Sequence, residues 1–299
     1  MKTLTVFTPT YNRAHTLGRV YESLCQQTCM DFEWLVVDDG SSDNTRELVD
    51  GYMADTSKGF AVRYIYKENG GLYTGYNVAY ANIDTELCVC IDSDDYMPDD
   101  AVEKIVSFWK EHGDSRYAGL LGLDYNIATK QLIGGKFPEG LKEVYFYDLT
   151  LKNLHSGDTK PVMRTSLMKR VAPQIGFPGE KNFNPVYMML QVCDDYPVLL
   201  MNENLCNVEY QIGADSMSQG IWRQYVNSAR SFAKLRLLEM GLKHNTWRNK
   251  VRVCVHYISS CLISRDGDWL RNSPLKMVTV LLSPAGLALY LLIMWKNRK

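Results

Sequence analysis

Three closely spaced carboxylates follow a short apolar run near the middle of the chain. The run over residues 87–91 has the composition of a buried strand. The carboxylates that follow it are Asp92, Asp94 and Asp95. Because like charges this close repel one another, they need a cation, and a Mg²⁺ or Mn²⁺ ion shared with nucleotide phosphates is the usual solution. Asp99 and Asp100 have a simpler explanation, since they precede a helical pattern and suit a helix N-terminus.

Two other polar segments follow predicted strands nearer the start of the chain. A strand over Leu4–Thr8, ended by Pro9, leads into the loop 10–13, and a strand over Phe32–Val37 leads into the polar segment 38–45. Each loop precedes a helical pattern, and this repetition predicts parallel βαβ units. Ligands of such sheets bind at the carboxyl ends of the strands. We therefore expect all three polar segments to meet at one edge.

The order of these motifs closely resembles that of the family 2 glycosyltransferases of GT-A fold. The segments that carry the resemblance are Thr-Pro-Thr-Tyr-Asn-Arg at 8–13, Val-Val-Asp-Asp-Gly-Ser-Ser-Asp at 36–43, Asn-Gly-Gly at 69–71 with Asn77, and Ile-Asp-Ser-Asp-Asp at 91–95. The resemblance is specific over residues 3–120 and weaker to about residue 220. It implies a Rossmann-like mixed α/β sheet and an inverting, metal-dependent sugar transfer from a nucleotide-diphosphate sugar, with UDP the expected nucleotide. The implied acceptor is a saccharide or lipid-linked hydroxyl in cell-surface polysaccharide or glycolipid synthesis.

The resemblance also implies roles for single residues. Asp39 would read the nucleobase, and Asp92 and Asp94 would be the Asp-x-Asp carboxylates that hold the ribose and the metal. The residues expected to bind the nucleotide-sugar are Thr8, Pro9, Tyr11, Arg13, Asp39, Lys67, Asn77, Asp92 and Ser93. These roles suit the side chains, because a carboxylate accepts a hydrogen bond from a pyrimidine N–H, and a metal stabilises charge on a departing diphosphate.

One part of the family pattern is absent. Many relatives carry a basic residue near positions 74–76, where this chain has Thr-Gly-Tyr. We therefore expect Lys67, Arg13 or a residue elsewhere in the chain to supply the cation for the diphosphate. The pair Gly70 and Gly71 has the alternative interpretation of a simple turn.

An inverting transfer needs a general base that accepts the proton of the acceptor hydroxyl. In relatives this base is an acidic residue beyond the donor half, and Glu180 occupies a similar place here. Asp158 is the second candidate, and the nearby His155 is either an acceptor contact or a loop histidine with hydrogen-bond partners. Asp194 and Asp195 fit the exposed end of a helix over 185–192.

Composition supports an intracellular enzyme with a full hydrophobic core. Of the 299 residues, 46% are hydrophobic, and the eight cysteines include no Cys-x-x-Cys pair, which favours reduced thiols in the cytoplasm over disulfides or zinc. The residues before the first strand do not resemble a signal peptide. We expect a GT-A domain over 1–220, a mainly helical region over 221–299, and a boundary loop at 213–218.

The C-terminal region has an unusual charge and an apolar tail. Residues 221–299 contain 14 Lys or Arg and 3 Asp or Glu, a balance of +11 in a chain of net charge −1. Residues 277–295 contain no charged side chain, and basic residues flank them on both sides. The segment is long enough to span a bilayer, but Ser-Pro-Ala-Gly at 283–286 interrupts it. We favour a broken helix in the inner face of the cytoplasmic membrane, with a true span and a soluble packing helix as alternatives. Membrane lipid, and not nucleic acid, is the expected anionic partner.

Two other functions remain open from the sequence. A haloacid-dehalogenase phosphatase also places Asp-x-Asp at a strand end, but its motif lies near the N-terminus and expects Thr or Val two positions after the second Asp, where this chain has Tyr96. A non-catalytic nucleotide-sugar-binding protein would bind the donor without turnover.

Overall fold

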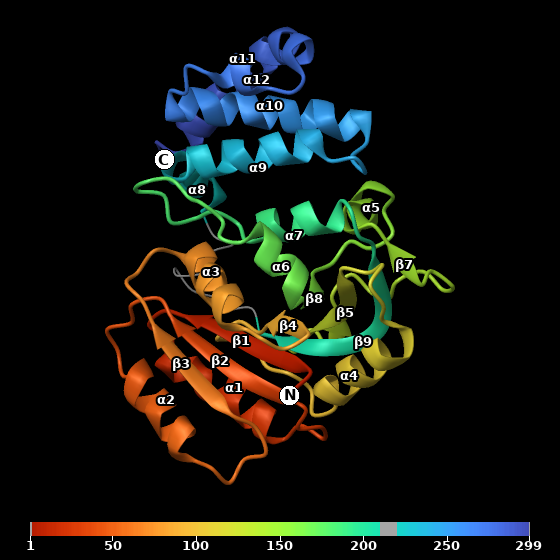
Figure 1. Ribbon diagram of the computed structural model, residues 1–299. Helices are drawn as coiled ribbons and strands as arrows, with labels where there is room; N and C mark the ends of the chain where they lie inside the picture. The colour runs from red at the N-terminus through yellow and green to blue at the C-terminus, as the bar shows by residue number, and fades with distance from the viewer. Residues whose placement is uncertain (1, 210–219, 299) are drawn as a thin grey trace.

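The computed structural model describes residues 2–209 and 220–298, so the predicted boundary loop at 213–218 lies outside the described residues. Its centre is one nine-stranded mixed sheet with the strand order β3-β2-β1-β4-β8-β5-β9-β7, in which β6 pairs with β5. Figure 1 shows helices packed on both sides of it. The strands are β1 Leu4–Thr10, β2 Phe32–Asp38, β3 Val62–Tyr66, β4 Leu87–Cys90, β5 Gly119–Asn126, β6 Gln131–Leu132, β7 Glu143–Val144, β8 Thr159–Arg164 and β9 Val198–Val208.

The first four strands form the parallel half of the sheet. β1 pairs in parallel with β2 and β4, and β2 pairs in parallel with β3, which confirms the predicted βαβ units. Every residue of β1 is buried, as expected for a strand covered on both faces. The helices around these strands are α1 Ala14–Cys25, α2 Thr45–Ala54, α3 Leu72–Asn82 and α4 Ala101–His112.

Pro9 does not end the first strand, contrary to the sequence prediction. β1 continues to Thr10 alongside β2, whereas its pairing with β4 stops at Phe7. The Phe7 carbonyl accepts from the Ile91 N–H on the β4 side, and residue 9 faces that same side by the two-residue period of a strand. Because β4 has already turned away there, the missing N–H of proline leaves no ladder hydrogen bond unmade.

The second half of the sheet is mixed. β8 runs antiparallel to both β4 and β5, and β9 runs parallel to β5. The antiparallel direction brings the start of β8 to the edge where β4 ends, next to the acidic residues. The short helices of this half are α5 Phe146–Leu151, α6 Thr165–Val171 and α7 Val186–Cys193.

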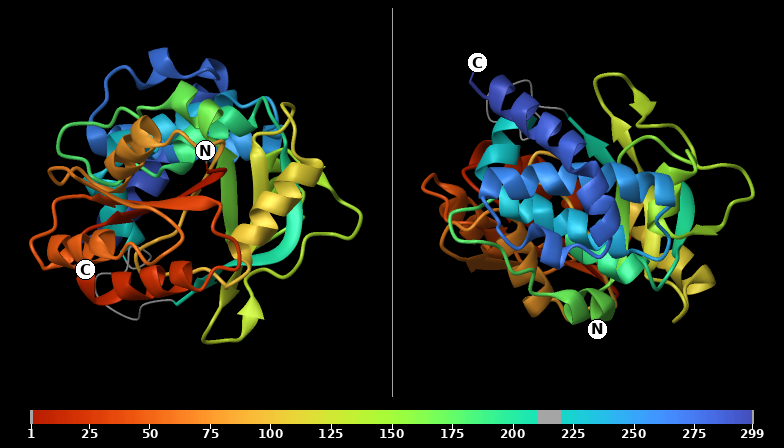
Figure 2. Two further views of the ribbon diagram at one scale, coloured as in Figure 1. Left: turned by 60° about the horizontal axis from the view of Figure 1, so that its bottom comes forward. Right: turned by 90° about the horizontal axis from the view of Figure 1, so that it is seen from above.

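Five helices follow residue 220 and form a stack that covers α7 (Figures 1 and 2). They are α8 Ile221–Asn227, α9 Ala229–Gly241, α10 Trp247–Ser264, α11 Trp269–Asn272 and α12 Lys276–Lys296. A separate hydrophobic cluster joins α9, α10 and α12 around the buried Tyr257. This cluster supports our proposal that residues 221–299 form a region of their own beside the domain 1–220.

The apolar C-terminal segment is one continuous helix, so the predicted break is wrong. α12 runs through Pro284, whose missing N–H would otherwise bond to the carbonyl of Val280. The hydroxyl of Ser283 donates to that carbonyl at 2.7 Å. The serine therefore supplies the hydrogen bond that the proline cannot make, and the helix passes through the Ser-Pro pair.

Candidate functional site

The loops after β1 and β2 are joined at the carboxyl edge of the parallel half of the sheet. Asn12 adopts a left-handed conformation, with a φ of 53°. Its N–H donates to Ser41 Oγ at 2.9 Å, and its side-chain oxygen accepts from the Ser42 N–H at 2.8 Å. These bonds fix the two polar loops against each other at the edge where β4 also ends.

Asp39 is the centre of a dense hydrogen-bond cluster at this edge. Its carboxylate is 5% exposed and accepts from the N–H groups of Gly70 and Gly71 at 2.9 and 2.8 Å. Lys67 donates to the same carboxylate, which pairs the two residues. Asn69 adds a contact at 3.2 Å. The Asn-Gly-Gly segment is therefore shaped by Asp39, and a ligand that reached this carboxylate would displace one of these donors.

The backbone around Gly71 requires glycine. Its φ is 93°, and a Cβ at this position would collide with the carbonyl of Lys181. Lys181 also donates to the side-chain oxygen of Asn69. The start of α3 is thus in contact with the loop that carries the candidate base Glu180.

The first strand contributes side chains of two kinds. Thr8 is fully buried, and its hydroxyl accepts from Trp34 Nε1 at 3.0 Å, so the side chain belongs to the core. Pro9 is buried as well, whereas Tyr11 is 50% exposed in the following loop. Arg13 is half-buried at the start of α1. Among the residues expected to line a nucleoside, Tyr11 has the accessible aromatic face on which a base could stack.

The acidic residues after β4 differ in exposure. Asp92 is exposed, Ser93 is 8% exposed, and Asp94 is half-buried with its backbone carbonyl held by Arg19 Nη2 at 3.2 Å. The Asp95 N–H donates to the Asp92 carbonyl at 3.0 Å, which closes the turn. The turn presents the carboxylates of Asp92 and Asp94 outward and places Asp95 beneath them.

Asp95 belongs to a buried charged cluster that the sequence did not predict. Burial raises the pKa of Asp95 to about 7, although Lys160 acts in the opposite direction. Lys160 Nζ lies 3.8 Å from Asp124 Oδ1, and both side chains are almost fully buried. Burial would lower the pKa of Lys160, but Cys206, Asp124 and the acidic residues after β4 raise it well above its usual value. A buried cation therefore compensates several carboxylates at this edge. In the sequence Lys160 is only one lysine in a strand, because nothing there reveals which strands pair.

The described part of the chain, 2–209 and 220–298, contains no group of three or more His, Cys, Asp or Glu side chains arranged to hold one metal ion. Asp92 and Asp94 would supply only part of the oxygen ligands that Mg²⁺ or Mn²⁺ prefers. This donor set fits an ion whose other ligands are diphosphate oxygens and water.

The two candidate bases lie in different environments. Both carboxylate oxygens of Glu180 accept backbone N–H groups at the start of α9, from Arg230 at 2.9 Å and from Ser231 at 2.7 Å. Asp158 is exposed and directly precedes β8. β8 runs antiparallel to β4, and the pairing of Val89 with Val162 brings the start of β8 toward the edge where β4 ends. The structure thus brings Asp158 to the acidic edge and uses Glu180 to join its loop to α9.

Three further residues named from the sequence have partners or positions that explain them structurally. Asn77 donates to the carbonyl of Gln174 at 2.9 Å and accepts from its N–H at 2.8 Å, so it holds the chain there. Asp194 accepts from the N–H groups of Lys243 and His244 and so also contacts the C-terminal region. His155 is buried beside Phe137, and burial lowers its pKa although the Asp158 backbone opposes this.

A cavity of about 240 Å³ opens beside Asp92, between α3, α6 and α7. Most of its lining is apolar or aromatic and includes Phe7, Tyr76, Tyr80, Met163, Met168 and Met189. It is large enough for part of a sugar, and it gives the acidic edge an adjacent space in which a substrate could bind.

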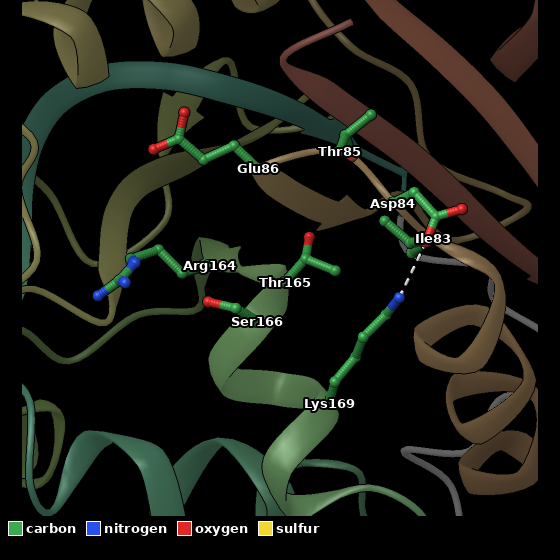
Figure 3. Close-up of a pocket in the computed structure, with 8 residues that line it drawn as sticks. All are labelled: Ile83, Asp84, Thr85, Glu86, Arg164, Thr165, Ser166 and Lys169. Carbon is green, nitrogen blue, oxygen red and sulfur yellow. Dashed lines mark hydrogen bonds and ion pairs between the residues drawn. The ribbon is translucent and has the colours of Figure 1, made fainter. Parts of the chain in front are cut away.

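Another cavity, of about 310 Å³, lies at the opposite edge of the sheet, where β4 begins (Figure 3). Its charged groups already have partners in the protein. Lys169 pairs with Asp84 at 3.1 Å, and Arg164 donates to the carbonyls of Ser115 and Tyr117. These contacts explain the polar lining structurally.

The segment that contains the three polar loops is similar in sequence to known glycosyltransferases. Residues 5–127 match the model of glycosyl transferase family 2. The chain is 34% identical to a chondroitin synthase of Pasteurella multocida over 100 residues, which cover 33% of this chain and 10% of that protein. It is 31% identical to the glycosyltransferase GlyG of Streptococcus pneumoniae over 103 residues, which cover 34% of this chain and 33% of that protein. The matches thus span a third or less of these relatives.

The fold has a counterpart among solved structures. The crystal structure of residues 1–349 of TarS from S. aureus, in complex with UDP-GlcNAc, matches with a TM-score of 0.66 at 17% identity. The match covers 100% of this chain and 92% of that one, so the GT-A fold with its helical C-terminal region is confirmed. The similarity to glycosyl transferase family 2 covers residues 5–127, a segment that includes the loops after β1, β2 and β4.

Proposed function

We propose that this protein transfers a sugar, with inversion, from a nucleotide-diphosphate sugar to an acceptor hydroxyl. The observation that carries the proposal is the convergence of three polar loops at one sheet edge, all within the segment that matches the family model. We propose UDP as the nucleotide, because TarS, which shares the fold, has been solved with UDP-GlcNAc. The acceptor is a saccharide or a lipid-linked saccharide of a cell-surface polymer or glycolipid.

The proposed donor site uses the residues of this edge. Tyr11 would stack on the base, and Asp39 would accept the base N–H in exchange for one of its present donors. Release of Lys67 from Asp39 would then free a cation near the diphosphate. Binding of the base and neutralisation of the diphosphate would thus be coupled through one ion pair.

Asp92 and Asp94 would hold a Mg²⁺ or Mn²⁺ ion together with the donor diphosphate. Such an ion stabilises the negative charge that grows on the leaving diphosphate. The protein contributes the carboxylates of Asp92 and Asp94 on a turn that the Asp95 N–H closes. Beneath this turn, the positive charge of Lys160 offsets the negative charge of the buried carboxylates. Mn²⁺ accompanies GDP-Man in a structure of the mannosyltransferase PcManGT of Pyrobaculum calidifontis, which has the same fold.

We propose Asp158 and Glu180 as the two candidates for the general base, and strand register favours Asp158. The start of β8 lies at the edge where β4 ends, so Asp158 is close to the acidic turn that would hold the donor diphosphate. Each carboxylate oxygen of Glu180 already accepts one backbone N–H of α9, which leaves it fewer acceptor sites for a hydroxyl.

The charge and the tail of the C-terminal region support a membrane surface as a partner. We propose that the enzyme works in the cytoplasm, attached to the inner face of the cytoplasmic membrane, where lipid-linked acceptors are available. The balance of +11 over residues 221–299 suits anionic lipid.

A thermal-shift screen against UDP-, GDP-, dTDP- and CMP-sugars, with and without Mn²⁺, tests the donor proposal. We expect one nucleotide class to raise the melting temperature, because a ligand that binds only the folded state stabilises it. Binding without any turnover would favour the non-catalytic alternative. Covalent phosphate on Asp92 would favour the phosphatase. No stabilisation by any nucleotide-sugar would contradict the proposal.

A further inference from the structure

α12 is the outermost helix of the C-terminal stack. Figure 1 shows α10 between α9 and the start of α12, with the C-terminus beside α8, and the view from above in Figure 2 shows α12 lying across α10. Among the described residues, α12 is the one helix long and apolar enough to cross a membrane, yet only 17% of its most apolar window is buried. A core helix of a soluble protein would be mostly buried, so the exposure of α12 needs another explanation.

The two faces of α12 differ sharply in burial. Thr279, Gly286 and Ile293, spaced seven residues apart, are its buried residues and form one narrow stripe. A Cβ on Gly286 would collide with Ile258 of α10, so the two helices are in close contact. The ten exposed residues between the flanking lysines are all apolar, and they are Met277, Val280, Leu281, Pro284, Ala285, Leu287, Ala288, Leu291, Leu292 and Trp295.

These ten residues form one continuous apolar face. Successive residues of an α-helix are about 100° apart, which places the ten within one half of the helix, opposite the buried stripe. The same spacing places Lys276 and Lys296 at the two borders of this face, and both are exposed. Lys296 also lies 5.2 Å from the ring of Trp295. A wide apolar face bordered by lysines and a tryptophan matches the chemistry of an anionic lipid surface.

Both ends of α12 are attached to the same body. Near its start, Thr279 Oγ1 lies 3.3 Å from Cys254 Sγ of α10, and after its end Asn297 donates to the Trp222 carbonyl of α8 at 3.3 Å. A spanning helix would carry one of these ends through the bilayer. It would also bring exposed arginines of α10, Arg248 and Arg252, toward the hydrocarbon, which is costly.

We propose that α12 lies flat in the surface of an anionic membrane, with its apolar face among the lipids and its opposite face on α10, and that it does not span the bilayer. The inference deepens the membrane association proposed above and does not depend on the transfer reaction. A helix of 21 residues is about 30 Å long, so this contact would hold the whole body in one orientation on the membrane.

The first experiment measures binding of the full chain to vesicles of phosphatidylcholine with or without phosphatidylglycerol. We expect binding to the anionic vesicles, and at least a tenfold loss in the variant Leu281→Glu/Leu291→Glu, whose two sites are 76% and 58% exposed. The matched control is Met53→Glu on α2, a residue that is 45% exposed and lies outside the site and the stack. Thermal melts of all three proteins check folding. Substitution is preferable to deletion of residues 273–299, because deletion would expose the core of the stack.

The second experiment separates a flat helix from a span. Sealed membrane vesicles with the cytoplasmic face outward are prepared from cells that express the full chain with a C-terminal epitope. We expect protease to remove both the epitope and the catalytic domain. Epitope protected inside the vesicles would show a span and overturn the proposal.

Two other results would also overturn it. One is a wild-type protein that does not bind anionic vesicles. The other is a lipid-free dimer that dissociates in the Leu281→Glu/Leu291→Glu variant, since a second copy of the chain would then be the partner of this face. A donor that binds and reacts normally in either case would leave the proposed sugar transfer intact.

Discussion

The ammonium group of Lys160 lies 3.8 Å from Asp124 Oδ1, inside the sheet and directly below the acidic turn after β4. The two residues come from neighbouring antiparallel strands, β8 and β5. The lysine is the counter-charge to Asp124 on β5 and to Asp92 and Asp95 in the turn after β4. The buried Lys160 therefore balances the negative charge beneath Asp92 and Asp94, the residues that would bind the metal.

Replacement of Lys160 tests this role. Lys160→Met leaves Asp124 buried without its cation. We expect a loss of about 3 kcal/mol in the free energy of unfolding, because breaking a buried pair leaves one charge without a partner. Urea unfolding measures the loss. The double variant Lys160→Met/Asp124→Leu removes both charges and should recover most of the stability. If the double variant were as unstable as the single one, the pair would not be the cause.

The same variant has a predicted pH dependence. Burial raises the pKa of Asp124 above its usual value, and Lys160 opposes this, so Lys160→Met should raise that pKa further. A carboxyl with a raised pKa in the folded state binds more protons folded than unfolded, so its contribution to stability falls as pH rises above the unfolded value of about 4. The deficit of Lys160→Met should therefore be larger at pH 8 than at pH 5. An equal deficit at both values in urea titrations would contradict this explanation.

The Asp-x-Asp motif is tested by Asp94→Asn. We expect a loss of turnover of at least about 10²-fold with little change in melting temperature, because a half-exposed charged ligand is replaced by a neutral one of the same shape. The control is Asp99→Asn, an exposed aspartate that precedes α4. Wild-type turnover that is unaffected by a chelator would show that no metal is needed.

The two candidate bases make opposite predictions. If Asp158 is the base, Asp158→Asn lowers transfer by about 10²-fold or more and leaves donor binding unchanged. Glu180→Gln should then act mainly through stability, since it weakens the bonds to the N–H groups of Arg230 and Ser231. Single-turnover rates and thermal melts on both variants distinguish the roles. A large rate loss in Glu180→Gln with an unchanged melting temperature would reverse the assignment.

The donor loop is tested by Gly71→Ala. The left-handed φ and the collision with the Lys181 carbonyl should distort the loop that Asp39 organises, and we expect donor affinity to fall by about tenfold or more. Gly51→Ala on α2 is the matched control, because a Cβ there meets nothing within 4 Å. Calorimetric titration with the identified donor measures the difference, and equal affinities would contradict the role given to this loop.

The sequence predicted the local features of this molecule better than the long-range ones. Hydrophobic runs and turn residues predict the parallel strands and the sheet edge at which β1, β2 and β4 end. The strand through Pro9 and the helix through Pro284 could not. Each depends on a tertiary or side-chain detail, namely the early departure of β4 and the hydroxyl of Ser283.

Residue roles were harder to predict than elements. Asp39 was singled out correctly as a residue of the edge, but its bonds to Gly70 and Gly71 join residues 31 and 32 positions apart in the chain. Lys160 was missed because its importance comes only from antiparallel pairing with β4 and β5. Glu180 was chosen by chain position, which does not reveal that α9 would start against its carboxylate.

Release of nucleoside diphosphate from a purified nucleotide-sugar is the decisive measurement for the proposed sugar transfer. The full-length protein is incubated with the donor selected by thermal shift, with Mn²⁺ or with a chelator, and Asp94→Asn is run in parallel. We expect slow hydrolysis that an acceptor saccharide accelerates. We also expect the chelator to abolish it and the variant Asp94→Asn to lack it. Donor binding without any release of nucleoside diphosphate, in the presence of metal and a range of acceptors, would contradict it.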